Sequence, residues 1–252
     1  MEQRERVLIV SVQTTQTDED FAYANQELAQ LVDTAMGEVV ATVTQKRESI
    51  SGRTLVGKGK VEEISHLVDE LEVDLVVFYQ SLTGSMVKNL NESINCRIID
   101  RVQLILDIFA MRARSKEGKL QVQLAQLNYL LPRLSGQREG LSRQGGGIGT
   151  RGPGETRLET DRRYIRKQIQ DIEEQLEQIK KHRERSREKR KSSNGFQLGL
   201  IGYTNAGKST ILNQLTQACT YQMDQLFATL DPLTRQVDLF PNFEVTLTDT
   251  VG

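Results

Sequence analysis

Over residues 1–110, short β-branched runs alternate with stretches whose apolar residues have helical spacing. VLIVSV, EVVATVTQ and DLVVFYQ are typical of strands, and the intervening segments, such as KVEEISHLVDELE, are typical of helices. Strands that alternate with helices in this way predict a mostly parallel sheet flanked by helices. We therefore predict an N-terminal α/β domain over residues 1–112.

Beyond Met111 the β-branched runs stop and a heptad pattern begins. A first apolar seam recurs at alternating steps of four and three residues, at Leu120, Leu124, Leu127, Leu131 and Leu134. A second seam comprises Leu158, Ile165, Ile169, Ile172, Leu176 and Ile179, and Thr156 with Glu159 can form a capping box where this helix starts. The two seams predict an antiparallel helical hairpin, a coiled coil, over residues 113–194, with a glycine-rich tip at 135–154 and a basic linker.

A phosphate-binding pattern follows the hairpin. GYTNAGKS, Gly202 to Ser209, matches G-x-x-x-x-G-K-[ST] and lies between the apolar run FQLGLIGY and the amphipathic segment STILNQLTQA. The glycines let successive amides turn toward a phosphate at a helix N-terminus, and Lys208 adds a positive charge. We expect the Ser209 hydroxyl to be a ligand for Mg²⁺. We predict that residues 195–252 are the first part of a P-loop G domain that ends after a D-x-x-G motif.

That motif is Asp249 to Gly252, at the end of the apolar run EVTLTDTVG. In a nucleotide switch its Asp holds Mg²⁺ through water and its Gly amide meets the γ-phosphate, so its distance from the P-loop indicates a GTPase-type site. Thr229 and Thr234 are candidates for the threonine that closes on Mg²⁺. An ordinary turn around Asp231 is the alternative interpretation for either threonine.

Three segments raise the question of further anion contacts. The glycine loop in TLVGKGKVEEI, with Lys58 and Lys60, is either a phosphate site or a plain strand-to-helix turn. The basic run 180–191 is either an RNA contact or a solvated helix face. The arginines around the glycine-rich tip are better candidates for RNA binding, because a flexible backbone lets several of them reach phosphates together. They are Arg143, Arg151 and Arg157.

Composition and charge exclude several classes of protein. A formal net charge of −1 excludes the global basic field of a histone-like nucleic-acid binder, so any RNA contact must come from a local patch. The 2 cysteines and 2 histidines fit neither a disulfide framework nor a zinc site, which is typical of a reducing, cytoplasmic compartment. No apolar run is long enough for a signal-peptide core or a membrane span. We expect a cytoplasmic monomer without stable membrane association.

Several segments in order resemble the HflX family of ribosome-associated GTPases, and the resemblance covers essentially the whole chain. They are LVGKGKVEEI, LILDIFAMRARSKEGKLQVQLAQLNYLLPRLSG, GGGIGTRGPGETRLETDRR, GLIGYTNAGKST, FATLDPLTR and DTVG. The resemblance implies a GTPase that uses GTP and Mg²⁺, binds the large ribosomal subunit and acts on stalled or stressed ribosomes. It also implies that the N-terminal domain and the hairpin contact ribosomal RNA, and that some members use ATP in the N-terminal domain.

The same resemblance assigns roles to individual residues. The nucleotide-binding positions are Gly202, Asn205, Ala206, Gly207, Lys208, Ser209, Thr210, Asp249 and Gly252. Ser209, Thr229 and, through water, Asp249 fall on the positions that hold Mg²⁺. Leu233 stands where the family has threonine, which favours Thr229 as the switch residue.

The residues that read guanine and position the catalytic water in this family do not occur before Gly252. We therefore expect that this chain alone does not hydrolyse GTP. Two alternatives stay open, a truncated, non-catalytic module that binds ribosomal RNA and a P-loop ATPase of RNA metabolism.

Overall fold

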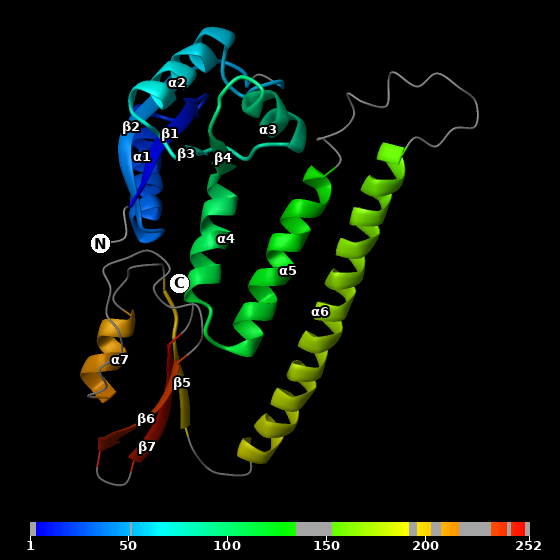
Figure 1. Ribbon diagram of the computed structural model, residues 1–252. Coiled ribbons are helices and arrows are strands. Elements are labelled where there is room, and N and C mark those ends of the chain that lie inside the picture. The colour runs from blue at the N-terminus through cyan, green and yellow to red at the C-terminus, as the bar shows by residue number, and fades with distance from the viewer. Residues whose placement is uncertain are drawn as a thin grey trace. The chain divides into compact units, whose positions relative to one another are not determined.

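A computed structural model describes residues 4–50, 52–134, 153–191, 196–202, 208–216, 233–240 and 243–249 (Figure 1). The chain divides into two compact units, residues 1–107 with 125–169 and residues 108–124 with 170–252. Within the described residues, no helix combines the length and the apolar character that crossing a membrane requires.

The N-terminal part is a four-stranded sheet in the order β2-β1-β3-β4, with all neighbours parallel. The mostly parallel sheet predicted from the alternating pattern is confirmed. Its strands are β1 (Glu5–Gln13), β2 (Gly37–Lys46), β3 (Leu75–Phe78) and β4 (Arg97–Asp100). The helices that follow them are α1 (Asp18–Thr34), α2 (Lys58–Glu70), α3 (Gly84–Asn91) and α4 (Arg101–Arg112).

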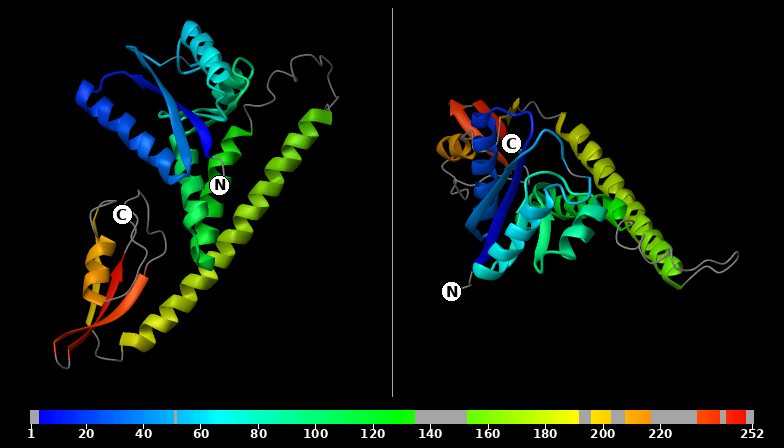
Figure 2. Two further views of the ribbon diagram at one scale, coloured as in Figure 1. Left: turned by 60° about the vertical axis from the view of Figure 1, so that its left-hand side comes forward. Right: turned by 90° about the horizontal axis from the view of Figure 1, so that it is seen from above.

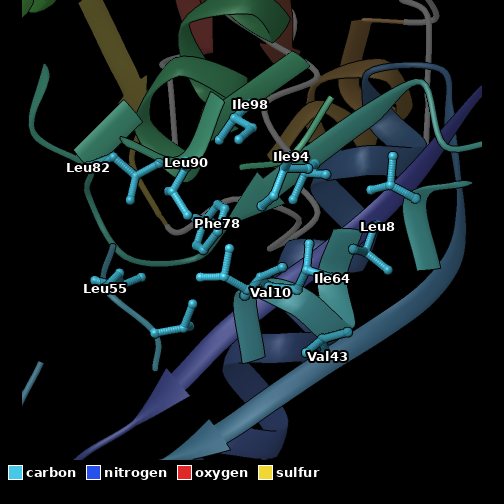
Figure 3. Close-up of a cluster of buried hydrophobic side chains, with 14 of the residues drawn as sticks. Leu8, Val10, Val43, Leu55, Ile64, Phe78, Leu82, Leu90, Ile94 and Ile98 are labelled. Atoms are coloured by element: carbon cyan, nitrogen blue, oxygen red, sulfur yellow. The ribbon is translucent and has the colours of Figure 1, made fainter. Parts of the chain in front are cut away.

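Helices cover both faces of this sheet, which explains why β1 is buried along almost its whole length. On one face the side chains of Leu8, Val10 and Phe78 form an apolar cluster with Ile64 of α2 and Leu90 of α3 (Figure 3). On the other face Ser11 donates a hydrogen bond to Asn25 of α1. Arg101 of α4 pairs with Glu27 of α1, so α1 and α4 lie on this second face.

The buried carboxylate of Asp100, at the end of β4, joins this domain to helix α5 (Lys116–Arg133). It accepts hydrogen bonds from the Leu82 amide at 2.9 Å and the Gln103 amide at 3.0 Å. From α5, Arg133 Nη2 lies 3.2 Å from Oδ2 of Asp100. Burial, followed by the hydrogen bond and the charge of Asp100, raises the pKa of Tyr129 well above its usual value. Tyr129 therefore stays protonated and can donate to the carboxylate.

Two opposite faces of helix α5 are buried to different extents. Gly118 and Val122 are buried on the face that also carries Tyr129. The leucines of the predicted seam lie on the opposite face and are half-buried; they are Leu120, Leu124, Leu127 and Leu131. The heptad pattern identifies only this second face, because the first one mixes glycine, glutamine and tyrosine.

The second hairpin helix, α6, is one continuous element over Pro153–Lys191 (Figure 2). Ile165 and Ile172 of the predicted seam are buried, and Arg183 Nη2 pairs with Glu117 Oε2 at 2.9 Å. This ion pair joins the beginning of α5 to the last third of α6, so the hairpin is antiparallel as predicted. The predicted start was wrong: Thr156 lies inside the helix, which begins three residues earlier at Pro153, a residue well suited to the first helical turn.

The C-terminal part contains β5 (Phe196–Leu200), α7 (Lys208–Thr216), β6 (Leu233–Phe240) and β7 (Phe243–Asp249). Its three strands form a second sheet in the order β5-β7-β6. The chain thus contains the parallel-sheet α/β domain and the antiparallel helical hairpin of the predicted fold class, followed by a second sheet that packs against α7.

Substituting Gly84 tests the contact between α3 and the end of α5. A Cβ added at Gly84 would clash with the carbonyl oxygen of Arg133, a backbone atom that cannot move alone. We expect Gly84→Ala to lower the free energy of unfolding by about 1–3 kcal/mol, measured by urea denaturation. Gly59→Ala in α2 is the matched control, because nothing lies within 4 Å of its added Cβ. An equal loss in both variants would contradict the proposed steric cause.

Substituting Asp100 tests the buried ion pair. Asp100→Asn removes the charge that faces Arg133, whose side chain is only 22% exposed. We expect a loss of roughly 2–3 kcal/mol in the free energy of unfolding, because a buried cation is left without its counter-charge. Combining Asp100→Asn with Arg133→Met should recover part of this loss. A double variant as unstable as the sum of the two single variants would show that the two side chains are not coupled.

Candidate nucleotide-binding site

The candidate site begins at one edge of the second sheet. β5 and β7 are parallel neighbours, and Leu200 is the direct partner of Asp249. Because the carboxyl ends of parallel strands meet at the same edge, the strand that leads into Gly202 and the strand that carries Asp249 finish side by side. Two motifs that are far apart in the sequence therefore start from one place in the fold.

Lys208 bridges the predicted phosphate loop. Its Nζ donates a hydrogen bond of 2.8 Å to the carbonyl oxygen of Gly202, the first residue of the motif. The Lys208 side chain is half-buried, so its ammonium group is partly shielded from water. The contact holds a positive charge between the end of β5 and the first residue of α7.

Packing of α7 on the sheet fixes the direction of this helix. Leu212 is fully buried among Val237, Val245 and Leu247, with Leu200 at the margin of the cluster. Since Lys208 both begins α7 and contacts Gly202, the N-terminal end of α7 lies at the carboxyl end of β5. The partial positive charge of a helix N-terminus and a lysine ammonium group thus converge there, which suits a phosphate group.

The structure describes several of the predicted nucleotide-binding residues. Gly202 and Lys208 are in contact, and Thr210 is exposed on the first turn of α7. The backbone places Ser209 in the same turn and Asp249 at the last position of β7. These positions bring the two motifs to one sheet edge, as a shared phosphate and metal site requires.

Other predicted residues lie outside the described part of the chain. They are Asn205, Ala206, Gly207, Thr229, Gly252, Arg143 and Arg151. Arg157 lies in the first part of α6, where the structure describes the backbone only. Thr234, the alternative to Thr229, lies within β6 opposite Thr248 of β7.

A magnesium site stays a prediction. Among the side chains that the structure describes, no group of three or more His, Cys, Asp or Glu residues could hold a metal ion. The expected Mg²⁺ ligands differ from such a cluster, because they combine the hydroxyl groups of Ser209 and Thr229 with the carboxylate group of Asp249. Thr229 falls outside the described ranges.

The glycine loop before α2 uses its own groups internally. Gly57 is the N-cap of α2, and its amide donates to the Gln45 side chain at 2.9 Å. Lys60 pairs with Glu63 at 2.7 Å. Two of the groups that a phosphate would need already have partners, which favours the plain strand-to-helix turn.

The carboxyl edge of the first sheet is also closed between its two central strands. The order β2-β1-β3-β4 places a topological switch between β1 and β3, where ligands of such sheets commonly bind. Here the Gln80 side chain hydrogen-bonds both the amide and the carbonyl group of Val12. The side-chain amide extends the ladder of hydrogen bonds across the switch point.

The residues that position the site lie outside the recognised motifs. They are Leu212 and its partners Val237, Val245 and Leu247. Leu212 lies one helical turn after Lys208, so the spacing of apolar residues after the motif was a usable signal. The hydrogen bond from Lys208 to the carbonyl group of Gly202 could not be predicted from the sequence, because every residue carries a carbonyl group.

Three family models match consecutive parts of the chain. Residues 22–110 match the model described as GTP-binding GTPase N-terminal, and residues 112–190 match GTP-binding GTPase Middle Region. Residues 197–252 match the model described as 50S ribosome-binding GTPase.

Similar proteins named GTPase HflX come from several bacteria. The protein of Alkalihalophilus pseudofirmus is 60% identical over 248 residues, which is 98% of this chain and 59% of the relative. The protein of Caldanaerobacter subterraneus subsp. tengcongensis is 52% identical over 99% of this chain and 58% of the relative. The Escherichia coli protein is 46% identical over 98% of this chain and 58% of the relative. The chain thus spans less than two thirds of the length of these relatives.

Solved structures share the fold. A crystal structure of SsGBP in complex with GDP has a TM-score of 0.54 and 24% identity, covering 98% of this chain and 62% of that chain. A GTP-binding protein from the archaeon Sulfolobus solfataricus, also in complex with GDP, has a TM-score of 0.50 and 22% identity, covering 98% of this chain and 61% of that chain. At these identities the similarity concerns the fold alone. The bacterial relatives and the three family models, by contrast, show that this chain belongs to the HflX family of GTPases.

Proposed function

We propose that the protein carrying this chain binds GTP at the loop from Gly202 to Ser209 and hydrolyses it with Mg²⁺. The observation that carries the proposal is the pairing of Leu200 with Asp249, which starts the phosphate loop and the D-x-x-G motif from one sheet edge. A GTPase needs both motifs there, because the first holds the phosphates and the second responds to the γ-phosphate.

Lys208 has the chemistry for phosphate binding. Its ammonium group hydrogen-bonds the neutral carbonyl group of Gly202. A phosphate oxygen carries negative charge and forms a stronger hydrogen bond with an ammonium group than a carbonyl oxygen does. We expect Lys208 to exchange the Gly202 carbonyl for a phosphate oxygen when nucleotide binds.

Mg²⁺ fits the residues that lie at this edge. It prefers oxygen ligands, and Ser209 in the first turn of α7 and Asp249 at the end of β7 supply a hydroxyl and a carboxylate group. Thr229 is the proposed third contributor. When bound, the ion would neutralise charge on the β- and γ-phosphates.

We further propose that the protein acts on the large ribosomal subunit when ribosomes are stalled or stressed. The description of the model matched by residues 197–252, a 50S ribosome-binding GTPase, supports this partner. The N-terminal domain (1–112) and the hairpin (113–194) are the proposed RNA-contacting parts, with Arg143, Arg151 and Arg157 at or beside the tip. Residues 195–252 are the proposed nucleotide-binding part of a monomeric, cytoplasmic protein.

A second candidate is that these 252 residues by themselves form a non-catalytic RNA-binding module. Four large apolar side chains of the second sheet and its helix are between 46% and 88% exposed: Leu198, Ile201, Ile211 and Leu215. Such surfaces normally lie against further protein, so we propose that hydrolysis needs further residues of the longer protein.

Lys208→Ala tests the nucleotide site. In the longer protein, we expect a loss of GTP affinity of at least about tenfold, or about 1.4 kcal/mol, because the phosphate loses its ammonium partner. Binding of fluorescent GTP in Mg²⁺ measures it, and Lys119→Ala on the exposed surface of α5 is the control. Unchanged GTP affinity in Lys208→Ala would contradict the proposal. Equal displacement of the probe by ATP and GTP would instead favour the ATPase alternative.

Deleting residues 145–153 tests the hairpin tip. We expect the longer protein to lose about tenfold in affinity for the large ribosomal subunit while its GTP affinity stays unchanged, because Arg151 is lost and the chain between Arg143 and Arg157 is shortened. Cosedimentation with purified subunits measures the first quantity and nucleotide titration the second. Equal loss of both would show that the tip supports the fold and does not serve recognition.

A further inference from the structure

Helix α6 exposes an aromatic ring among positive charges near its N-terminal end. Tyr164 is 62% exposed, although aromatic side chains are usually buried. The surrounding sequence, RRYIRK at 162–167, also contains exposed cations. We define the basic–aromatic patch as the four exposed residues Arg163, Tyr164, Arg166 and Lys167.

The seam of the hairpin determines where this patch points. Ile165 is 8% exposed and Ile172, two turns later, is 4% exposed, so these residues mark the packed side of α6. Arg163 and Lys167, four residues apart, lie on the opposite side at the helical repeat of 3.6 residues per turn. Tyr164 is exposed on the same outer half of the helix, three residues before Lys167. The patch is therefore presented to solvent by the same packing that closes the hairpin.

The charges of the patch have no partners in the described part of the chain. No ion pair joins its cations to a carboxylate, although Glu159 and Asp171 stand four residues from Arg163 and Lys167. Arg163 and Lys167 are like charges at a spacing that weakens a helix. The cations thus form no ion pair with a carboxylate of the described residues, and an anionic partner would relieve the repulsion between Arg163 and Lys167.

The Tyr164 ring is held in place while its surface stays available. Gln168 Nε2 donates a hydrogen bond of 3.2 Å to the Tyr164 hydroxyl oxygen one turn along the helix. The cation–π contacts found among the described residues involve Tyr79 and Tyr129 instead. A tethered aromatic ring loses little freedom when another ring stacks on it.

The positive region is bounded along α6. Asp171, Glu173, Glu174 and Glu177 follow the patch without an intervening basic residue. An anionic chain attracted to the patch is repelled by the next two turns of the helix. Contact is therefore confined to the N-terminal, greener end of α6 in Figure 2.

We propose that the basic–aromatic patch binds single-stranded or looped RNA, with Tyr164 stacked on an unpaired base and Arg163 and Lys167 on phosphates. The proposal rests on the proposed function and extends it by naming a contact outside the hairpin tip. Every nucleotide offers a flat base beside a phosphate, which matches a ring flanked by cations. A membrane surface would require a broader apolar face, whereas the isoleucines of this segment are packed inward.

Tyr164→Trp supplies the direct test, because the chain contains no tryptophan. Tryptophan emission of this variant of the 252-residue chain should be quenched by a short adenine-rich RNA oligonucleotide and not by inorganic polyphosphate, which has charge without bases. Tyr164→Ala should weaken binding of that oligonucleotide about tenfold, whereas Tyr164→Phe should stay within about twofold, because stacking needs the ring and not the hydroxyl group. Gln178→Ala, exposed on the same helix beyond the acidic stretch, is the control and should bind as the parent chain does.

Arg163→Ala separates charge from stacking. It should lower the salt dependence of binding, since one phosphate contact is lost, while leaving the quenching at saturation unchanged. Circular dichroism of each variant checks that α6 remains helical.

Three outcomes would overturn the proposal. The first two are equal affinity of Tyr164→Ala and the parent chain for the RNA oligonucleotide, and equal quenching of tryptophan emission by polyphosphate and RNA. The third is that Tyr164→Ala abolishes subunit binding by the longer protein although the 252-residue chain binds no RNA. The last outcome would indicate contact with a ribosomal protein. Absence of subunit binding by the longer parent protein, with RNA quenching intact, would refute the ribosomal function and leave the patch as an RNA site.

Discussion

The buried carboxylate of Asp100 is the constraint on which the N-terminal architecture depends. It ends β4, caps α4 through the Gln103 amide and holds the loop before α3 through the Leu82 amide. It also pairs with Arg133, whose guanidinium group lies 3.4 Å from the centre of the Tyr129 ring. A charge in this position is tolerated only because these groups surround it. One side chain thereby fixes the end of a hairpin helix to the end of a strand.

The two sheets use their carboxyl edges differently. In the first, Gln80 spans the gap between β1 and β3 and makes the ladder hydrogen bonds that a neighbouring strand would make. In the second, the corresponding edge leads into the phosphate loop, with Lys208 across it. The same parallel pairing therefore produces a closed surface in one domain and a proposed nucleotide site in the other.

In the hairpin, different helix faces serve packing and the proposed RNA binding. On α6 the seam isoleucines Ile165 and Ile172 are buried and Ile169 and Ile179 are half-buried, whereas the charged residues lie outward in alternating basic and acidic stretches. On α5 both faces are used, one for the N-terminal domain and one for the seam. The described side chains of α6 include exposed cations and an exposed aromatic ring, which is why we place the proposed RNA contact there.

The sequence by itself determined the elements, the heptad seams and the phosphate-loop motif, because these depend on residues within a few positions of one another. It placed the start of α6 at a capping box, whereas a proline in the first turn begins the helix three residues earlier. Only the tertiary structure decided that Asp249 lies beside Leu200, that Asp100 holds α5, and that Lys208 meets the Gly202 carbonyl. Each of these contacts joins groups whose distance is set by strand register and helix packing, and local spacing carries no information about either.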